Sequence, residues 1–409
     1  MSKKLDNALD RELQQRIDQL LMEQGEYLPL ELLLAEGRLF YSDYEAWRNA
    51  QLRTLDEALF GDLKQISGIL RQAAQYAAAL GLHNETLVYE AWGDAPGGRL
   101  RFSADSALDA LFHRRYCRAQ PQLDLFMDAT ATLLANDIVG ALNNRDTAQA
   151  RCQLERLLDV DPGYNRLGDF ELLVVAAERL GCAIDDVDGK TAQLDFVRER
   201  LTPVAVDLLG NGGRALLVPW WRRLSDAFDS AAFDAQRAVY HASYCALQAQ
   251  EWQRAVESIE AEREWRLQPT LLQRYALSCM RLERRADALA AWFTLCWRFA
   301  DAAAAIEYDG SPELRRAWCE FFSLEPELEV NDFPAWLVLS YPGMALSSAI
   351  SESFVATWYA RCPPSFATAW KLAESTVHAP DAAMNIQLRA ELKSQHPALF
   401  DHFLARIHG

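Results

Sequence analysis

An acidic run, Asp185–Asp188, is the stretch whose residue types and spacing come nearest to a metal-binding loop. Carboxylates at alternate positions, followed by a glycine that permits a sharp turn, bind calcium in short loops. When Gly189 is aligned with that glycine, Ile184 stands where the first oxygen ligand belongs, and Asp195 stands where a bidentate glutamate belongs. The run is therefore interpreted as a solvated acidic turn, and no metal site is predicted.

Sequence motifs of the common catalytic and nucleotide-binding sites are absent from the chain. There is no His-Glu-x-x-His, no Gly-x-Ser-x-Gly and no Gly-x-Gly-x-x-Gly. Gly210–Gly213 is rich in glycine, but the Lys-Ser/Thr pair of a phosphate-binding loop does not follow it. The histidines show no metal-ligand spacing. No catalytic residue and no cofactor is predicted.

Tryptophan and arginine occur side by side several times in the second half of the chain. Ten of the 12 tryptophans lie between positions 220 and 370. Both residue types are enriched at the energetic centres of protein interfaces, so one hypothesis is a concave groove that binds a partner. The alternative, which the sequence favours, is that the large rings fill hollows of a helical stack. The candidate partner-binding residues are Trp221, Arg222, Arg223, Trp265, Arg266, Trp297 and Arg298.

Helical hairpins are the elements that would position these side chains. Two are expected in tandem within Val239–Phe299, where Ala255 and Ala288 are 33 positions apart and Cys245 and Cys279 are 34 apart. A small residue that recurs at such a period lets paired helices approach closely. We therefore interpret this block as the organising element of the chain.

The spacing of these hairpins resembles the tetratricopeptide repeat, a two-helix unit of about 34 residues. A third hairpin of this type is expected over Met127–Pro162, with its turn at 143–146. In all three hairpins the first helix lacks the Leu-Gly pair that is typical of the family. In the hairpin over Met127–Pro162, Asp137-Ile138 occupies the positions of that pair. The resemblance implies an all-α, TPR-like helical-hairpin solenoid with a concave face. It implies no particular partner.

The N-terminal segment has a different pattern. Aromatic and β-branched residues in Thr86–Trp92 and Arg99–Ser103, separated by turn residues, predict one β-hairpin, which we expect to be the only sheet. The expected domain organisation is an N-terminal helical region with this β-hairpin (1–118), a first helical-repeat segment (119–235), and TPR-like hairpins with C-terminal helices (236–409).

One short segment matches a known docking peptide. Gln122, Leu123, Asp124, Leu125 and Phe126 resemble the pentapeptide by which bacterial replication and repair proteins bind the sliding clamp. Such a peptide must be extended and exposed to bind. Here it leads directly into an apolar helix, so the favoured interpretation is that its leucines and phenylalanine cover the repeat core.

Composition limits the classes of partner. A net charge of −17 disfavours a broad nucleic-acid-binding surface, which needs clustered Lys and Arg. The 8 cysteines form no CxxC pair and are expected to be small core residues in a reducing compartment. The N-terminal stretch is polar, and no apolar run approaches the roughly 20 residues that span a bilayer. We therefore expect a cytoplasmic protein with no membrane association.

The leading functional hypothesis is a scaffold or adaptor that binds a protein or peptide on a concave helical face. One alternative is an accessory factor of DNA replication or repair that docks on the sliding clamp through Gln122–Phe126. Another is an enzyme whose site is assembled from residues far apart in the sequence. A homodimer that uses an apolar face near Ala390–Ile407 is a further hypothesis.

Overall fold

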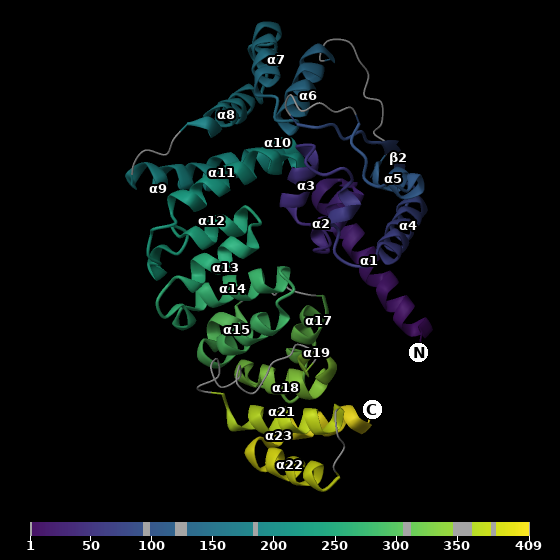
Figure 1. Ribbon diagram of the computed structural model, residues 1–409, viewed down its shortest axis with the longest axis vertical. Coiled ribbons are helices and arrows are strands. Elements are labelled where there is room, and N and C mark those ends of the chain that lie inside the picture. The colour runs from purple at the N-terminus through teal and green to yellow at the C-terminus, as the bar shows by residue number, and fades with distance from the viewer. Residues whose placement is uncertain are drawn as a thin grey trace. The chain divides into compact units, whose positions relative to one another are not determined.

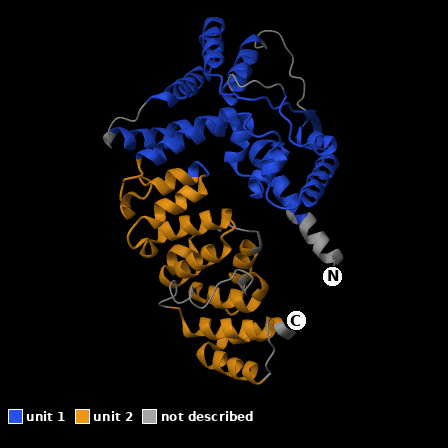
Figure 2. Ribbon diagram, in the orientation of Figure 1, with its two compact units in different colours: residues 1–227, 248–250 blue, residues 228–247, 251–409 orange. Residues whose placement is uncertain are grey.

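The chain forms two compact units in the computed structural model (Figure 2). Unit 1 comprises residues 1–227 with 248–250, and unit 2 comprises residues 228–247 with 251–409. The structure describes residues 2–92, 99–118, 129–182, 187–305, 312–346, 362–377 and 382–408. Each unit is considered by itself below, and the three-segment organisation drawn from the sequence stays a prediction.

Helices account for most of the described residues in both units (Figure 1), so the prediction of an all-α fold is confirmed at this level. Among the helices of the described ranges, none combines the length and the apolar character needed to cross a membrane.

The first part of unit 1 consists of helices around a small sheet. Asp62 and Asp105 begin two of these helices, because each carboxylate accepts a hydrogen bond from a first-turn N–H group. The elements are α1 (Ser2–Gln24), β1 (Glu26–Tyr27), α2 (Pro29–Ala35), α3 (Tyr41–Arg48), the 3₁₀ helix η1 (Leu55–Ala58), α4 (Leu63–Ala79), β2 (His83–Thr86), α5 (Ser106–Phe112) and β3 (Arg114–Cys117).

The sheet differs from the sequence-based prediction. It has three strands in the order β1-β3-β2, with both pairs antiparallel, and Cys117 lies opposite both Glu26 and His83. Within 86–103 the described residues contain a single antiparallel bridge, Glu90 to Arg99. The prediction that this region holds the only sheet is therefore wrong. The observed strands are only two to four residues long, and they pair with strands far away in the sequence. A local sequence pattern therefore could not predict them.

Aromatic side chains fill the core beneath this sheet. Trp47 and Phe112 are fully buried, and the ring of Phe102 stacks on Phe112 with centroids 4.0 Å apart. The indole N–H of Trp47 donates to the carbonyl of Arg101 at 2.9 Å, which satisfies its one polar atom. These contacts join α3, α5 and the segment that follows Arg99.

The second part of unit 1 is entirely helical. Its elements are α6 (Ala129–Asn143), α7 (Thr147–Val160), α8 (Leu167–Glu178), η2 (Arg179–Gly181), α9 (Val187–Phe196), the π turn η3 (Val197–Leu201), α10 (Thr202–Leu209), η4 (Gly210–Gly213) and α11 (Arg214–Ala227). The π turn ends at Leu201, two residues before Pro203, which lacks a backbone N–H. The Thr202 hydroxyl donates to the Val197 carbonyl at 2.7 Å, so that the helix continues through the irregular turn.

A glycine in η4 lies very close to a side chain of α6. A Cβ atom built on Gly212 would overlap the side-chain amide of Asn143 at the end of α6. The glycine-rich segment 210–213 therefore packs closely against the end of α6.

Unit 2 is a succession of short helices that surround one apolar core. Its elements are η5 (Ala235–Arg237), α12 (Ala242–Gln248), α13 (Trp252–Glu260), η6 (Trp265–Leu267), α14 (Pro269–Arg281), α15 (Arg285–Arg298), α16 (Ala300–Ala304), α17 (Pro312–Phe321), η7 (Val330–Asp332), α18 (Phe333–Ser340), α19 (Pro342–Leu346), α21 (Pro364–Val377), α22 (Ala382–Gln395) and α23 (Pro397–His408). Cys245, Cys279 and Cys296 are buried on these helices, as expected of small core residues. The same expectation is wrong for Cys319 of unit 2 and for Cys152 and Cys182 of unit 1, which are exposed.

Three hairpins, α6–α7, α12–α13 and α14–α15, share the same turn. Arg145, Gln250 and Glu283 occupy equivalent positions with left-handed φ values of 57°, 59° and 56°. In each, the N–H group of the next residue donates to a carbonyl five positions earlier, at 2.8–2.9 Å. Such a bond closes the end of a helix and reverses the chain.

A small residue follows each of these turns at the same offset. The residues five positions after the left-handed position are Ala150, Ala255 and Ala288, and they are at most 1% exposed. The helices expected over 127–162 and 239–299 are thus present, and the second helix of each pair carries a small buried residue at this position.

Candidate functional site

The candidate residues Trp265 and Arg266 belong to a continuous stack of side chains in unit 2. The Arg266 guanidinium lies 4.7 Å from the centre of the Trp265 ring, and that ring lies 4.4 Å from the ring of Tyr275. Arg284, the residue that precedes α15, lies 5.9 Å from the centre of the Tyr275 ring. We call these four residues the unit 2 stack.

The two rings of the unit 2 stack are buried, whereas its cations reach the surface. Trp265 and Tyr275 are 4% and 2% exposed, but the Arg284 side chain is 35% exposed, and Arg266 is also exposed. The neighbouring Leu267 is 45% exposed. The stack therefore presents guanidinium groups that are held in place on a rigid aromatic base.

Carboxylates bind Tyr275 and Arg284 of the unit 2 stack. The Tyr275 hydroxyl donates to Glu260 at 2.9 Å, and Arg284 donates to Asp287 at 2.8 Å. Burial raises the pKa of Tyr275, so this hydroxyl remains a hydrogen-bond donor at neutral pH. Burial alone would lower the pKa of Arg284, but its hydrogen bond to Asp287 and the neighbouring charges raise it.

The other candidate pair in unit 2, Trp297 and Arg298, lies at the end of α15. The Trp297 ring packs edge-on against Phe366 of α21, with centroids 4.8 Å apart, and it borders the apolar core. This indole is thus mainly a packing group. Arg298 is partly exposed in the last turn of the helix, where a cation suits the helix dipole.

The remaining candidates, Trp221, Arg222 and Arg223, lie on α11 in unit 1. Trp221 is 3% exposed and is therefore a core residue. Arg223 lies 4.8 Å from the centre of the Trp220 ring and donates to the carbonyls of Arg179 and Cys182. The structure thus divides the seven candidates between two units, and buried indoles are a poor lining for a groove.

Arg222 leads to a cluster of charged side chains that the sequence analysis missed. Its guanidinium donates to one oxygen of Glu45 at 2.9 Å, and Arg145 donates to the other oxygen at 2.5 Å. Arg214 forms a second ion pair with Glu31 at 2.5 Å. The two carboxylates are only 8% and 3% exposed.

A fourth arginine, Arg48, lies deeper in this cluster. It donates to the Tyr44 hydroxyl at 2.7 Å and to Asn144 at 2.8 Å, and it is 6% exposed. Arg48 and Arg145 both lie near the Trp92 ring, at 4.8 and 3.9 Å from its centre. The cluster therefore joins α3 and the segment after β2 to the α6–α7 turn.

The charged groups of this cluster affect the pKa of a buried tyrosine, Tyr41. Burial raises the pKa of Tyr41, Glu45 raises it further, and Arg145 and Arg214 act in the opposite direction. Tyr41 therefore lies close to charged groups of both ion pairs. No periodicity or short motif could have revealed the cluster, because its members lie up to about 190 positions apart in the sequence.

A histidine, a serine and a glutamate meet in unit 2, the residue types of nucleophilic catalysis. The Ser243 hydroxyl lies 2.8 Å from Nδ1 of His241, and Nε2 of that ring lies 3.4 Å from Glu262. Arg274 donates to the same hydroxyl at 3.0 Å. His241 is 2% exposed and Ser243 is fully buried, so a substrate does not reach this hydroxyl.

This buried group stabilises the start of α12. The backbone N–H of Ser243 donates to Nδ1 of His241 at 3.2 Å, which places the ring proton on Nε2. Burial lowers the pKa of His241, Arg274 lowers it as well, and Glu262 opposes them. The imidazole is therefore neutral at neutral pH and acts as a helix cap.

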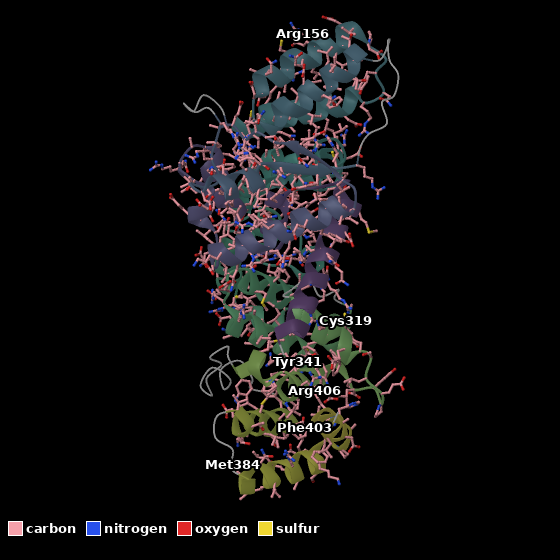
Figure 3. All side chains as sticks on the ribbon, turned by 90° about the vertical axis from the view of Figure 1, so that its right-hand side faces the viewer. Arg156, Cys319, Tyr341, Met384, Phe403 and Arg406 are labelled. Carbon is pink, nitrogen blue, oxygen red and sulfur yellow. The ribbon has the colours of Figure 1, made fainter. Side chains whose placement is uncertain are left out.

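The C-terminal end of unit 2 carries a further surface contact. Figure 3 shows Tyr341 and Arg406 beside each other, and the guanidinium lies 4.5 Å from the ring centre. Both side chains bind Glu320. In the region of the homodimer hypothesis, Leu392, Leu399 and Phe400 are at most 8% exposed, so their apolar surface faces the core.

Two sequence-based predictions concern residues that the structure leaves largely undescribed. The pentapeptide Gln122–Phe126 lies outside the described residues, so clamp docking stays a prediction. The side chains of the run Asp185–Asp188 also lie outside them. Among the described residues, no group of three or more histidine, cysteine, aspartate or glutamate side chains could hold a metal ion.

Comparisons of the chain with protein-family models, with curated proteins and with solved structures find no match.

Proposed function

We propose that the protein is an interaction scaffold that binds a protein or peptide partner at the exposed edge of the unit 2 stack. The observation that carries the proposal is the arrangement of Arg266 and Arg284 on the buried rings of Trp265 and Tyr275. Leu267 adds exposed apolar area beside them. Arginine and aromatic anchors at a rigid surface are the usual energetic centres of interfaces.

The stack favours binding because its cations are already ordered. Fixing a flexible side chain at an interface costs roughly 0.5–1.5 kcal/mol. A guanidinium that already lies on an indole has lost part of this freedom, so less is lost when a partner contacts it.

The proposed architecture is a TPR-like solenoid of helical hairpins. The hairpins α12–α13 and α14–α15 follow one another in the chain and have equivalent left-handed turns, which supports it, because repeats of one geometry that stack on one another build an extended surface.

Affinity capture from a native extract, followed by mass spectrometry, tests the proposal. Wild-type protein is compared with Arg266→Glu and with the matched control Arg263→Glu, which changes the charge of a nearby exposed residue equally. The expected result is one or more proteins captured by the wild type and the control but lost with Arg266→Glu. The proposal would be contradicted if all three proteins, each shown to be folded by circular dichroism, captured the same set of partners.

A further inference from the structure

The strand β2 lies at one edge of the unit 1 sheet. β3 pairs with it on one side, and the strand order β1-β3-β2 places no described strand on its other side. All four residues of β2, His83–Thr86, are exposed. An edge strand presents backbone groups with which a further strand can pair. The free side of β2 is therefore a candidate interaction surface.

The end of β2 shows which backbone groups face β3. The N–H group of Leu87 donates to the His113 carbonyl at 2.9 Å. The Leu87 carbonyl accepts a hydrogen bond from Nδ1 of the His113 ring, also at 2.9 Å. Both backbone groups of Leu87 therefore point towards the segment that begins β3.

The residues of β2 alternate in direction from this point. In an antiparallel pair, consecutive residues turn their N–H and carbonyl groups to opposite sides of the strand. Glu85 and His83 therefore face β3 as Leu87 does, whereas Asn84 and Thr86 face away from it. Among the hydrogen bonds of the described residues, none involves the backbone groups of Asn84 or Thr86.

We propose that β2 pairs antiparallel with β2 of a second copy of the chain, across a twofold axis at Asn84. Residues that face outwards must lie opposite each other for hydrogen bonds to form, so the axis passes through Asn84, Glu85 or Thr86. An axis at Glu85 sets glutamate opposite glutamate, which is unfavourable. An axis at Thr86 sets Glu85 opposite an apolar residue, Leu87.

The axis at Asn84 is the one that gives complementary pairs. It places Glu85 of each copy opposite His83 of the other, so that a carboxylate meets an imidazole twice. A charged residue and a short length usually protect an edge strand against pairing. In β2 the charged residue has a complementary residue two positions away, and this protection fails in one register.

Apolar side chains near the two ends of β2 fit the same register. Leu80 and Val88 are 46% and 50% exposed, and each lies four positions from Asn84. An antiparallel pair centred on Asn84 brings the Leu80 end of one copy to the Val88 end of the other, twice. Burial of apolar surface at both ends would stabilise the pair. Because strands of four residues make a small interface, the expected dimer is weak and dissociates on dilution.

Sedimentation velocity of the full-length protein, over a series of concentrations, measures this equilibrium. The expected result for the wild type is a reversible dimer. His83→Glu sets glutamate opposite glutamate twice, so it should weaken the dimer about tenfold. Adding Glu85→His to this variant places histidine opposite glutamate again, and most of the wild-type affinity should return.

Two further variants sharpen the test. Gln72→Glu adds the same charge at an exposed position of α4 and should leave the dimer unchanged. Asn84→Pro removes an N–H group that faces away from β3, so it should abolish the dimer without removing a bond of the sheet. If Asn84→Pro fails to fold by circular dichroism, the exchange of His83 and Glu85 still decides, because both side chains are exposed.

Several outcomes would overturn the proposal. One is a wild-type protein that is monomeric at every concentration. Another is a dimer whose affinity neither His83→Glu nor a folded Asn84→Pro variant changes, because its interface would lie elsewhere. Equal weakening by Gln72→Glu would indicate general charge repulsion, and an exchange that recovers no affinity would exclude the register centred on Asn84. The proposal concerns unit 1 and does not depend on the surface proposed for the unit 2 stack.

Discussion

The two units are stabilised in different ways. Unit 1 buries carboxylates, Glu31 and Glu45, between elements that are far apart in the sequence. Unit 2 buries mainly the apolar faces of neighbouring helices, as at Ala288 and Phe293, apart from the group around Arg274. Two hairpins with the same turn can therefore respond differently to the same substitution. The side chain at the turn of unit 1, Arg145, binds a buried carboxylate, whereas the side chain at the turn of α14–α15, Glu283, is exposed.

The largest effect is expected at the turn of unit 1. Arg145→Gly relieves a left-handed φ of 57° but removes the contacts to Glu45, to the Ala215 carbonyl and to the Trp92 ring. Because Glu45 is buried, we expect the free energy of unfolding of unit 1 to fall by about 2–3 kcal/mol. Hydrogen exchange of unit 1 peptides, followed by mass spectrometry, measures this change. No loss of protection would show that the cluster contributes little to stability.

The next largest effect is expected where the second helix of a unit 2 hairpin contacts the first. Ala288→Leu places extra methyl groups at a position that is 1% exposed, so it should destabilise unit 2 by about 1–3 kcal/mol. The control is Ala390→Leu on the exposed face of α22, which should change stability by less than about 0.5 kcal/mol. Urea unfolding compares the two variants. Equal effects would contradict the close packing of α14 and α15.

A smaller effect is expected from pH. Burial lowers the pKa of His241 in the folded state, whereas the unfolded chain binds a proton at this residue below about pH 6.5. Stability of unit 2 should therefore fall as the pH is lowered through 6.5, until the folded-state pKa is passed. Urea unfolding at several pH values measures the slope.

His241→Asn separates this contribution from that of the carboxylates. Asparagine keeps a side-chain oxygen that can accept the Ser243 N–H but does not titrate. The variant should show a shallower dependence on pH between about 7.5 and 5.5 than the wild type does. An unchanged slope would assign the dependence to other groups.

The smallest effect, with the opposite sign, is expected at the turn of α14–α15. Glu283 is exposed and has a φ of 56°, which is unfavourable for a residue with a Cβ atom. Glu283→Gly should therefore stabilise unit 2 by about 0.5–1 kcal/mol, in contrast to Arg145→Gly in unit 1. A thermal melt detects the rise, and a lower melting temperature would mean that the Glu283 side chain has a role of its own.

The hairpins could be predicted because their signals are local and periodic. Ala255 and Ala288 mark the second helices by their spacing, and both are buried. The burial of Trp265 also follows from the view that large rings fill hollows. Such patterns depend on residues a few positions apart, which a single sequence shows directly.

The sheet and the charged cluster could not be predicted, because their contacts are long-range. Cys117 pairs with Glu26, and nothing near either residue has the alternation of a strand. Likewise, Glu45 acquires its partners only after the chain has brought the α6–α7 turn and α11 to α3. A lone arginine such as Arg222 suggests a surface group until its buried partner is known.

The close approach of η4 to α6 implies a coupling between two positions of unit 1. Because a methyl group at Gly212 would collide with the side-chain amide of Asn143, that amide must move when a side chain is added at position 212. In sequences that share this fold, a side chain at the first position should be accompanied by serine, alanine or glycine at the second. Such paired variation in two chains would indicate that they share this packing contact even where their sequences are otherwise dissimilar.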